Sequence, residues 1–169
     1  MFNYCPICKS ENIDTHKLPL IQCESCDFTY FHNCASAVAG IICCDNQILF
    51  NIRAKQPALG CLDLPGGFVD YDEGLEQALT REVKEELNID IKHWKYLSSH
   101  PNTYEYKKVI FKTTDAVFIS HLQSKPQITV EEQEVSDYVW VDINEIDITK
   151  IGFKSLQSAI TLFLEKHMN

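Results

Sequence analysis

Hydrophobic and polar positions divide the chain into segments with two different periods. Residues 35–44 form a continuous run of mostly small or apolar side chains, which predicts a buried strand. Asp45 and Asn46 predict a turn, and residues 47–53 predict the hairpin partner of that strand. The rest of the pattern predicts strands at residues 93–98, 108–120 and 138–141 and loops at residues 55–59 and 121–129.

Two segments instead carry apolar residues at helical spacing. In residues 75–87 the apolar positions are Leu75, Ala78, Leu79, Val83 and Leu87. Gly74 stands at the N-cap position, and Asn88 can adopt the left-handed conformation that ends a helix. Residues 153–166 predict a second helix with one apolar face. This order of elements predicts an α/β (α+β) fold for residues 35–169, a sandwich with a mixed sheet between helices.

Residues 1–34 carry two Cys-x-x-Cys pairs, which predict a small zinc ribbon in front of that domain. The four cysteines are Cys5, Cys8, Cys23 and Cys26. Each pair supplies two thiolates from one turn, and a hairpin between the pairs brings the turns together around a tetrahedral Zn²⁺ ion. His32 and Cys34 are alternative ligands. A segment of this size has almost no core, so metal binding would provide most of its folding free energy.

Composition and charge limit the class of protein. The chain has 169 residues, of which 45% are hydrophobic, and its formal net charge is 15 − 24 = −9. This composition excludes wholesale disorder, and an acidic chain gains little from nucleic acid or anionic lipid, so neither is expected as a partner. No signal peptide or membrane-spanning stretch is recognisable, so we expect a soluble, cytoplasmic protein. Cys43, Cys44 and Cys61 are expected to be buried small residues.

The first predicted helix concentrates carboxylates on one side. Glu82, Glu85 and Glu86 are three or four residues apart, so they project from neighbouring positions and repel one another. A divalent cation removes that repulsion, and Mg²⁺ or Mn²⁺ prefers carboxylate oxygen. Arg81 can pair with Glu73 and hold the preceding loop against the helix. The alternative interpretation is a solvent-exposed amphipathic helix rich in Glu and Lys.

The complete pattern resembles the Nudix hydrolase family. The family's box is Gly-x5-Glu-x7-Arg-Glu-U-x-Glu-Glu-x-Gly-U, where U is apolar, and it matches the chain from Gly67 to Ile89. Its last Gly is replaced by Asn88, and Asn is the next-best residue for a left-handed conformation. The preceding Leu-Pro-Gly-Gly-Phe-Val at residues 64–69 also resembles the family's usual entry to the box. The resemblance covers residues 37–167.

The resemblance implies that water attacks phosphorus in a nucleoside diphosphate linked to another group, with Mg²⁺ or Mn²⁺ as cofactor. It makes Glu82, Glu85 and Glu86 the metal ligands, one of them also a candidate base, while Arg81 and Glu73 orient the helix. Other candidates around this site are the backbone of Gly66 and Gly67 for metal or phosphate, Arg53 for phosphate or ribose, Tyr104 or Tyr106 for a base, and Glu131, Glu132 or Glu134 as an alternative general base.

A four-cysteine ribbon before a Nudix box narrows the resemblance to the NADH pyrophosphatases. That subgroup has a Ser-Gln-Pro-Trp-Pro-Phe-Pro-x-Ser motif, of which residues 99–106 keep only Ser-x-Pro. The expected substrate is therefore a small dinucleotide or nucleotide-sugar diphosphate such as NAD(H) or ADP-ribose. The alternatives are a nucleoside triphosphate house-cleaning hydrolase, a non-catalytic binding or regulatory module, and a thiol redox protein. Homodimers are frequent in the family, so a homodimer is expected.

Overall fold

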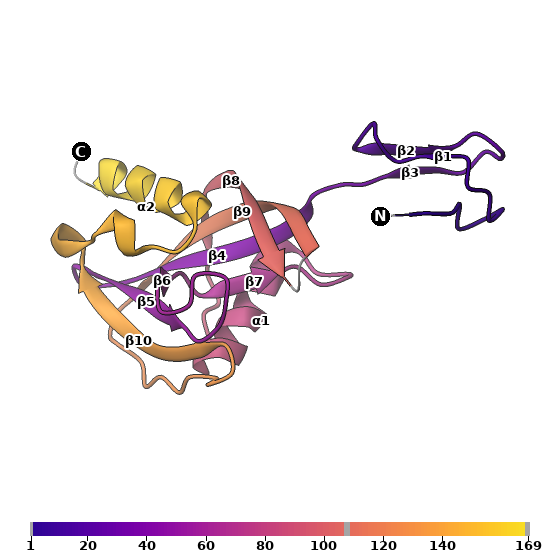
Figure 1. Ribbon diagram of the computed structural model, residues 1–169. Coiled ribbons are helices and arrows are strands. Elements are labelled where there is room, and N and C mark those ends of the chain that lie inside the picture. The colour runs from indigo at the N-terminus through magenta and orange to yellow at the C-terminus, as the bar shows by residue number, and fades with distance from the viewer. Residues whose placement is uncertain (1, 107–108, 168–169) are drawn as a thin grey trace. The chain divides into compact units, whose positions relative to one another are not determined.

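The computed structural model describes residues 2–106 and 109–167, apart from the side chain of Tyr106. The chain forms two compact units, residues 1–34 and residues 35–169. Figure 1 labels the helices and strands of both.

The N-terminal unit is a three-stranded antiparallel sheet. Its order is β1 (Ile13–Asp14), β2 (Leu20–Cys23) and β3 (Thr29–Phe31). The hairpin of β1 and β2 lies between the two cysteine pairs, as the spacing predicts, whereas β3 was not expected. Cys5, Ile21 and Cys23 are its buried apolar residues. Such a small buried set supports the view that this unit depends on its cysteines for stability.

The second unit is built on one mixed sheet in the order β10-β5-β4-β9-β8, with β6 beside β5 and β7 beside β4. Strands β4 and β9 run parallel, and the other pairs are antiparallel. The strands are β4 (Ala35–Cys44), β5 (Gln47–Arg53), β6 (Leu62–Asp63), β7 (Gly66–Phe68), β8 (Lys95–Tyr106), β9 (Val109–Leu122) and β10 (Val135–Asp142).

Helices α1 (Leu75–Leu87) and α2 (Lys154–His167) cover opposite faces of this sheet (Figure 1). Val38 and Ile42 of β4 belong to the core under α1, whereas Ile41 and Cys43 belong to the core under α2. Because both faces of β4 are covered, the strand appears in the sequence as an uninterrupted apolar run. The predicted α/β/α sandwich with a mixed sheet is therefore confirmed. Two 3₁₀ turns, Ile143–Glu145 and Ile148–Lys150, connect β10 to α2.

The sequence pattern predicts β4, β5 and α1 with their observed bounds. Gly74 is the N-cap of α1, and Asn88 follows it in the left-handed conformation with φ 56°. Strands β8 and β9 differ from the prediction, because they form one long hairpin that continues through Pro101 and ends at Leu122. Cross-strand pairing extends both strands beyond the ranges predicted from the sequence. The expected strand start at Lys108 lies outside the described residues.

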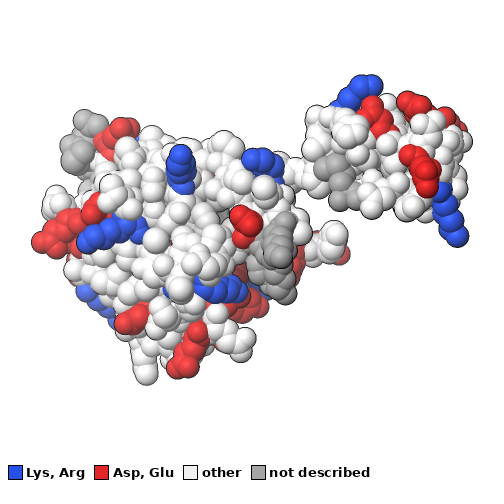
Figure 2. Space-filling model, in the orientation of Figure 1, with Lys and Arg blue, Asp and Glu red and all other residues white. Residues whose placement is uncertain are grey.

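Charged residues are mixed over the surface shown in Figure 2. On this face, Lys and Arg alternate with Asp and Glu, and the described residues form no continuous basic patch. Among residues 2–106 and 109–167, no helix combines the length and apolar character needed to cross a membrane. Cys43 and Cys44 are buried as expected, whereas Cys61 is only partly buried.

Candidate active site and metal centre

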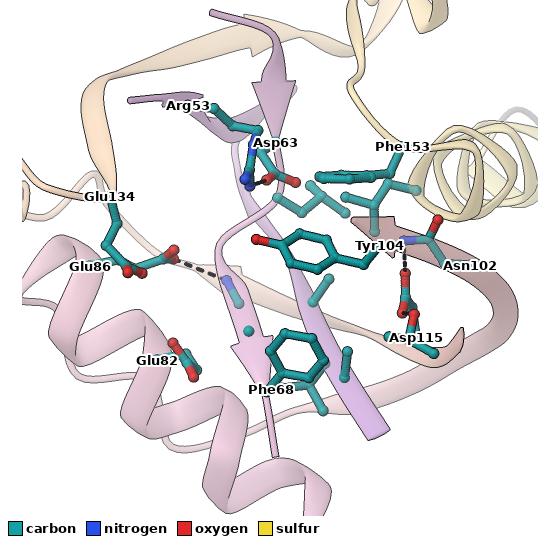
Figure 3. Close-up of a pocket in the computed structure, with 18 of the residues that line it drawn as sticks. Arg53, Asp63, Phe68, Glu82, Glu86, Asn102, Tyr104, Asp115, Glu134 and Phe153 are labelled. Carbon is teal, nitrogen blue, oxygen red and sulfur yellow. Dashed lines mark hydrogen bonds and ion pairs between the residues drawn. The ribbon is translucent and has the colours of Figure 1, made fainter. Parts of the chain in front are cut away.

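A pocket of about 360 Å³ brings α1 together with β7, β8 and the segments before β10 and α2. Glu82, Glu86 and Glu134 line one part of it and are called the carboxylate wall below. The rings of Phe68, Tyr104 and Phe153 line another part and are called the aromatic wall (Figure 3). A pocket lined by both carboxylates and aromatic rings suits a ligand that carries both charge and a flat ring.

Glu86 is the buried member of the carboxylate wall. Its Oε2 atom accepts hydrogen bonds from the backbone nitrogen of Gly66 at 3.0 Å and from Asn51 Nδ2 at 3.1 Å. Burial raises the pKa of Glu86 well above its ordinary value, and the nearby carboxyl groups of Asp63, Glu82 and Glu134 raise it further, although the Gly66 hydrogen bond opposes this. A carboxyl group in these surroundings is stabilised by a proton or by a cation.

The glycines of β7 allow the backbone to approach these carboxylates. A Cβ atom on Gly67 would lie 2.6 Å from the carboxylate of Glu82, and a Cβ on Gly66 would lie 2.1 Å from the backbone oxygen of Val38. Gly66 also has φ 149°, which disfavours other residues. Small residues are therefore required where β7 passes between β4 and α1.

Arg81 holds the loop before α1 and two of the glutamates. Its Nε and Nη2 atoms donate to the two oxygens of Glu73 at 2.7 and 2.9 Å, which is the predicted ion pair. Its Nη1 atom donates to Glu82 at 2.9 Å and to Glu85 at 3.1 Å. The Arg81 hydrogen bond is the main cause of the lowered pKa of Glu73. Arg81 thus links the turn before the helix to the side of the helix that faces the pocket.

The three predicted metal-binding glutamates have different environments. Glu82 and Glu86 line the pocket, and burial raises the pKa of Glu82 although Arg81 opposes the shift. Glu85 is exposed, and the lining of the pocket does not include it. In the described part of the chain, only the four cysteines form a group of three or more ligands within 4.8 Å of one another. The three glutamates are therefore not gathered as closely in this structure.

Of the three acids proposed as an alternative base, Glu134 is the one that lines the pocket. It lies in the turn before β10 and forms an ion pair with Lys55, which also lines the pocket. Its charge contributes to the raised pKa values of Glu82 and Glu86. Glu131 instead caps the turn by accepting from the backbone nitrogen of Glu134 at 3.1 Å.

Arg53 lines the pocket but is strongly engaged within the protein. It pairs with Asp63 at 2.5 Å, donates to the backbone oxygen of Pro57 at 2.7 Å, and lies 5.0 Å from the centre of the Phe153 ring. Burial lowers the pKa of Arg53, but Asp63 and the hydroxyl group of Tyr104 raise it more. Sequence reasoning missed Asp63, whose place directly before the Leu-Pro-Gly-Gly segment was the available signal.

The predicted base-stacking residue Tyr104 is part of the aromatic wall. Its ring centre lies 5.6 Å from that of Phe68 and 6.0 Å from that of Phe153. Phe68 also contacts Phe111 at 6.2 Å, and both phenylalanines are 38% exposed. These rings therefore keep accessible faces next to the pocket. The side chain of Tyr106, the other candidate, lies outside the described part.

A polar cluster beside the aromatic wall was also missed. Asp115 is 6% exposed, lines the pocket together with Asn102 and Thr113, and accepts hydrogen bonds from both and from Ser155. The signal in the sequence was a charged residue directly before the apolar run of the predicted strand. A buried carboxylate in a strand needs such donors.

The four cysteine sulfurs of the N-terminal unit lie within 4.8 Å of one another. The Cys5–Cys26 and Cys8–Cys23 sulfur distances are both 3.7 Å. Burial raises the pKa of the Cys5 thiol, but hydrogen bonds from backbone groups and neighbouring thiols lower it to about 7 overall. Four thiols in this arrangement fit a zinc ribbon, and the alternative ligands His32 and Cys34 are not in the group.

Comparisons with known proteins identify relatives of this chain by sequence. Over 150 residues, the chain is 25% identical to the NAD-capped RNA hydrolase NudC of Vibrio atlanticus, covering 88% of this chain and 53% of the relative. Over 60 residues, it is 50% identical to the ADP-ribose pyrophosphatase of Methanocaldococcus jannaschii, covering 36% of this chain and 35% of the relative. The chain thus spans about half the length of the NudC relatives it matches.

Solved structures show the same architecture. The NUDIX hydrolase from Nitrosomonas europaea aligns over 99% of this chain and 93% of its own, with a TM-score of 0.77 and 22% identity. The NUDIX domain of Shewanella oneidensis NrtR, solved in complex with ADP ribose, aligns over 81% of this chain and 90% of its own, with a TM-score of 0.66 and 22% identity.

A mixed sheet between two helices, with a glycine-rich strand beside a glutamate-rich helix, defines a Nudix-type α/β/α domain. The model of the NUDIX domain matches residues 35–159, which is most of the chain. The protein belongs to the Nudix family, as the box at residues 67–89 predicts.

Proposed function

We propose that this protein is a metal-dependent pyrophosphohydrolase that cleaves a nucleoside diphosphate linked to another group. The observation that carries the proposal is the environment of Glu86. Its buried carboxylate is bound to the backbone of Gly66, and Glu82 and Glu134 line the same pocket. Family membership and the names of the relatives support the same reaction class.

The donor set of the carboxylate wall fits a hard divalent cation such as Mg²⁺ or Mn²⁺. Burial and mutual repulsion raise the pKa values of Glu82 and Glu86, and a bound cation would relieve both effects. Glu82 and Glu86 would hold it, with Glu85 joining them once it leaves Arg81. When bound, the ion neutralises phosphate charge and makes water a better nucleophile.

The chain's own groups have separable tasks in this reaction. Gly66 fixes one oxygen of Glu86, and Arg81 with Glu73 fixes the entry to α1. We assign Glu134 as the base that accepts a proton from the attacking water, since it lines the pocket and comes from a separate loop. Water then forms a bond to phosphorus, the bridging P–O bond breaks, and the two phosphorylated products leave.

The substrate that we propose is of the NAD(H) or ADP-ribose type. The relatives are named for NAD-capped RNA and for ADP-ribose, and the aromatic wall can accept a flat ring. The expectation that nucleic acid is not a partner stays a prediction. An NAD-capped RNA carries a dinucleotide at its end, so it could present the same chemical group to this pocket as free NAD(H). Arg53, which lies over the ring of Phe153, would contact the phosphate or ribose of the substrate beside the aromatic wall.

We propose Zn²⁺ as the ion of the four cysteines, with a structural role in residues 1–34, and residues 35–169 as the hydrolase domain. The thiol arrangement supports zinc because thiolate ligands at this spacing favour a closed tetrahedral site. A homodimer and a cytoplasmic location also stay proposals.

The test is a side-by-side assay of NAD(H), ADP-ribose, ATP and an NAD-capped RNA with Mg²⁺ or Mn²⁺, followed by chromatography of the products. Release of AMP from NAD(H) or ADP-ribose is expected. Release of pyrophosphate from ATP alone would instead support a nucleoside triphosphate hydrolase. Lack of turnover of every substrate, with metal-loaded and folded protein, would refute the proposed function.

A further inference from the structure

Asp115 is a buried carboxylate whose protein partners are all uncharged. Its Oδ2 atom accepts from Asn102 Nδ2 at 2.9 Å and from the hydroxyl group of Ser155 at 2.6 Å. Its Oδ1 atom accepts from the hydroxyl group of Thr113 at 2.6 Å. Within residues 2–106 and 109–167, these three donors are its hydrogen-bond partners, and no cationic side chain forms an ion pair with it. A carboxylate accepts about four hydrogen bonds, so Oδ1 retains capacity for one more donor.

Asn102 adds a donor beside this acceptor. Its Oδ1 atom accepts from the backbone nitrogen of Thr103 at 2.8 Å, which fixes the orientation of the amide. Its Nδ2 atom donates one hydrogen bond to Asp115, and among the described residues no acceptor is found for its second hydrogen. The two residues therefore retain one acceptor position on Asp115 Oδ1 and one donor hydrogen on Asn102 Nδ2, and both residues line the pocket.

The position of this pair relative to the other walls suggests what binds there. In Figure 3, Asn102 and Asp115 lie on the opposite side of the view from Glu82 and Glu86, with the rings of Tyr104 and Phe68 between them in projection. A nucleotide whose phosphates lie at the carboxylate wall would place its base against the aromatic wall. The edge of that base would then reach the polar pair.

We propose that Asp115 and Asn102 form a base-reading subsite that selects a heterocycle with an amino group beside a ring nitrogen, as in adenine. The amino group donates to Asp115 Oδ1, and the ring nitrogen accepts from Asn102 Nδ2. A base with a carbonyl oxygen in place of the amino group, such as hypoxanthine, presents an acceptor to the carboxylate and is rejected. Sites built to pair a polar group discriminate strongly against an analogue that leaves it unpaired. This inference rests on the proposed function, because it assumes a nucleotide ligand.

The ring contacts are consistent with this arrangement. Phe68 and Phe111 are partly exposed, and Tyr104 and Phe153 are only partly buried. Phe68 and Tyr104 line the pocket, so a base can stack on them without entering the core. Stacking alone accepts every base, so the selection must come from the polar pair.

The first test measures binding of AMP and IMP to the full chain by titration calorimetry without added divalent metal. These ligands differ only in the amino or carbonyl group that the subsite would read. AMP is expected to bind at least about 10-fold more tightly than IMP. Equal affinities, or no detectable binding of either nucleotide, would overturn the proposal without involving catalysis.

The second test uses variants of the pair. In Asp115→Asn the AMP-to-IMP affinity ratio should fall by about 10-fold or more, because the new amide can donate to a carbonyl oxygen. The matched control is Asp90→Asn, which removes the same charge from an exposed residue paired with Lys84 and should leave the ratio unchanged. Because the network of Asp115 is buried, Asn102→Ala is measured as well, and it should lower the ratio even if Asp115→Asn does not fold.

Failure of the subsite and failure of the proposed function can be separated. A protein that prefers AMP over IMP but hydrolyses no diphosphate would retain the subsite and lose the function. A protein that cleaves ADP-ribose and inosine diphosphate ribose with equal kcat/KM would retain the function and lose the subsite.

Discussion

Asn51 donates a hydrogen bond to the same oxygen of Glu86 that the backbone of Gly66 holds. The two donors lie 3.1 and 3.0 Å from Oε2, so the Oε1 atom is left for a cation. The Oδ1 atom of Asn51 is buried and, in the described part of the molecule, has no hydrogen-bond partner. The amide of Asn51 is therefore held at Glu86 by a single polar contact, and its effect can be tested by substitution.

Asn51→Leu should weaken the apparent affinity for Mg²⁺ by about 10- to 100-fold, which is typical when a residue supporting a metal ligand is lost. The fold should be retained, because the substitution also removes an unpaired buried oxygen. Mg²⁺ titrations of both the rate and the heat of binding would measure the effect. Asn144→Leu, at an exposed position outside the pocket, is the control. An unchanged Mg²⁺ affinity in Asn51→Leu would show that Asn51 does not support the ligand.

Glu86→Gln should lower kcat by more than about 100-fold, a larger loss than that expected for a supporting residue. Glu85→Gln should also abolish turnover if Glu85 joins the cation after leaving Arg81. Neither change should unfold the helix, since Gln has nearly the same shape as Glu and leaves the apolar packing of α1 in place. Glu76→Gln, at the exposed start of the same helix, should retain activity. Near-full activity of Glu86→Gln would contradict the assignment of the metal site.

The stability of the metal-free protein should depend on pH through Glu86. Its pKa in the folded protein is raised, so the folded state holds this proton more tightly than the unfolded state does. The resulting stabilisation is complete below the ordinary glutamate pKa and is lost as pH rises through the raised value. Denaturant titrations across pH should show this loss in the parent protein and a weaker loss in Glu86→Gln. If the free energy of unfolding depended on pH in the same way in both proteins, Glu86 would not be the group responsible.

Gly67→Ala should displace Glu82, because the added Cβ would lie 2.6 Å from its carboxylate. We expect a loss of about 1–3 kcal/mol in the free energy of unfolding, together with reduced turnover. Gly74→Ala is a suitable comparison, since its Cβ would approach Gln77 no closer than 3.4 Å. Thermal unfolding and initial rates measure both effects. Full activity in Gly67→Ala would mean that the position of Glu82 is not critical.

Cys5→Ser should release zinc and unfold residues 1–34, whose few buried residues include Cys5 itself. Metal analysis of the purified protein and hydrogen exchange would detect the two effects. Cys34→Ser, outside the cysteine group, should keep the metal. Zinc content that is unchanged in Cys5→Ser would refute the ribbon, and metal-free parent protein would revive a thiol redox role.

Local signals were sufficient for the elements that surround the site. Apolar spacing and caps predict α1, and the buried run predicts β4, because each pattern follows directly from helical or sheet geometry. The roles of Asp63 and Asp115 could not be predicted in this way. Asp115 depends on Ser155, which is 40 residues away. Asp63 depends on Arg53, which it meets where β6 pairs with β5. Side-chain contacts of this kind leave no periodic signal in a single sequence.

The different environments of the three glutamates also escaped prediction. Helical spacing places Glu82, Glu85 and Glu86 on neighbouring positions but does not say which of them faces β7. Packing of α1 against the sheet buries Glu86 and leaves Glu85 at the surface beside Arg81. The spacing therefore predicts that three carboxylates lie close together, but it does not predict which of them is buried and which is exposed.

The parallel pairing of β4 with β9 has a consequence for folding. The register runs from Ala35 opposite Thr113 to Cys44 opposite Leu122, so the central pair of the sheet joins distant parts of the chain. Closing so long a loop costs entropy before the contacts form, which slows folding in proteins of this topology. A slip of one residue would also turn the apolar side chains of β4 toward the wrong helix. Until β9 has been synthesised, β4 has an unpaired edge, and the nascent chain is most exposed to aggregation during that interval.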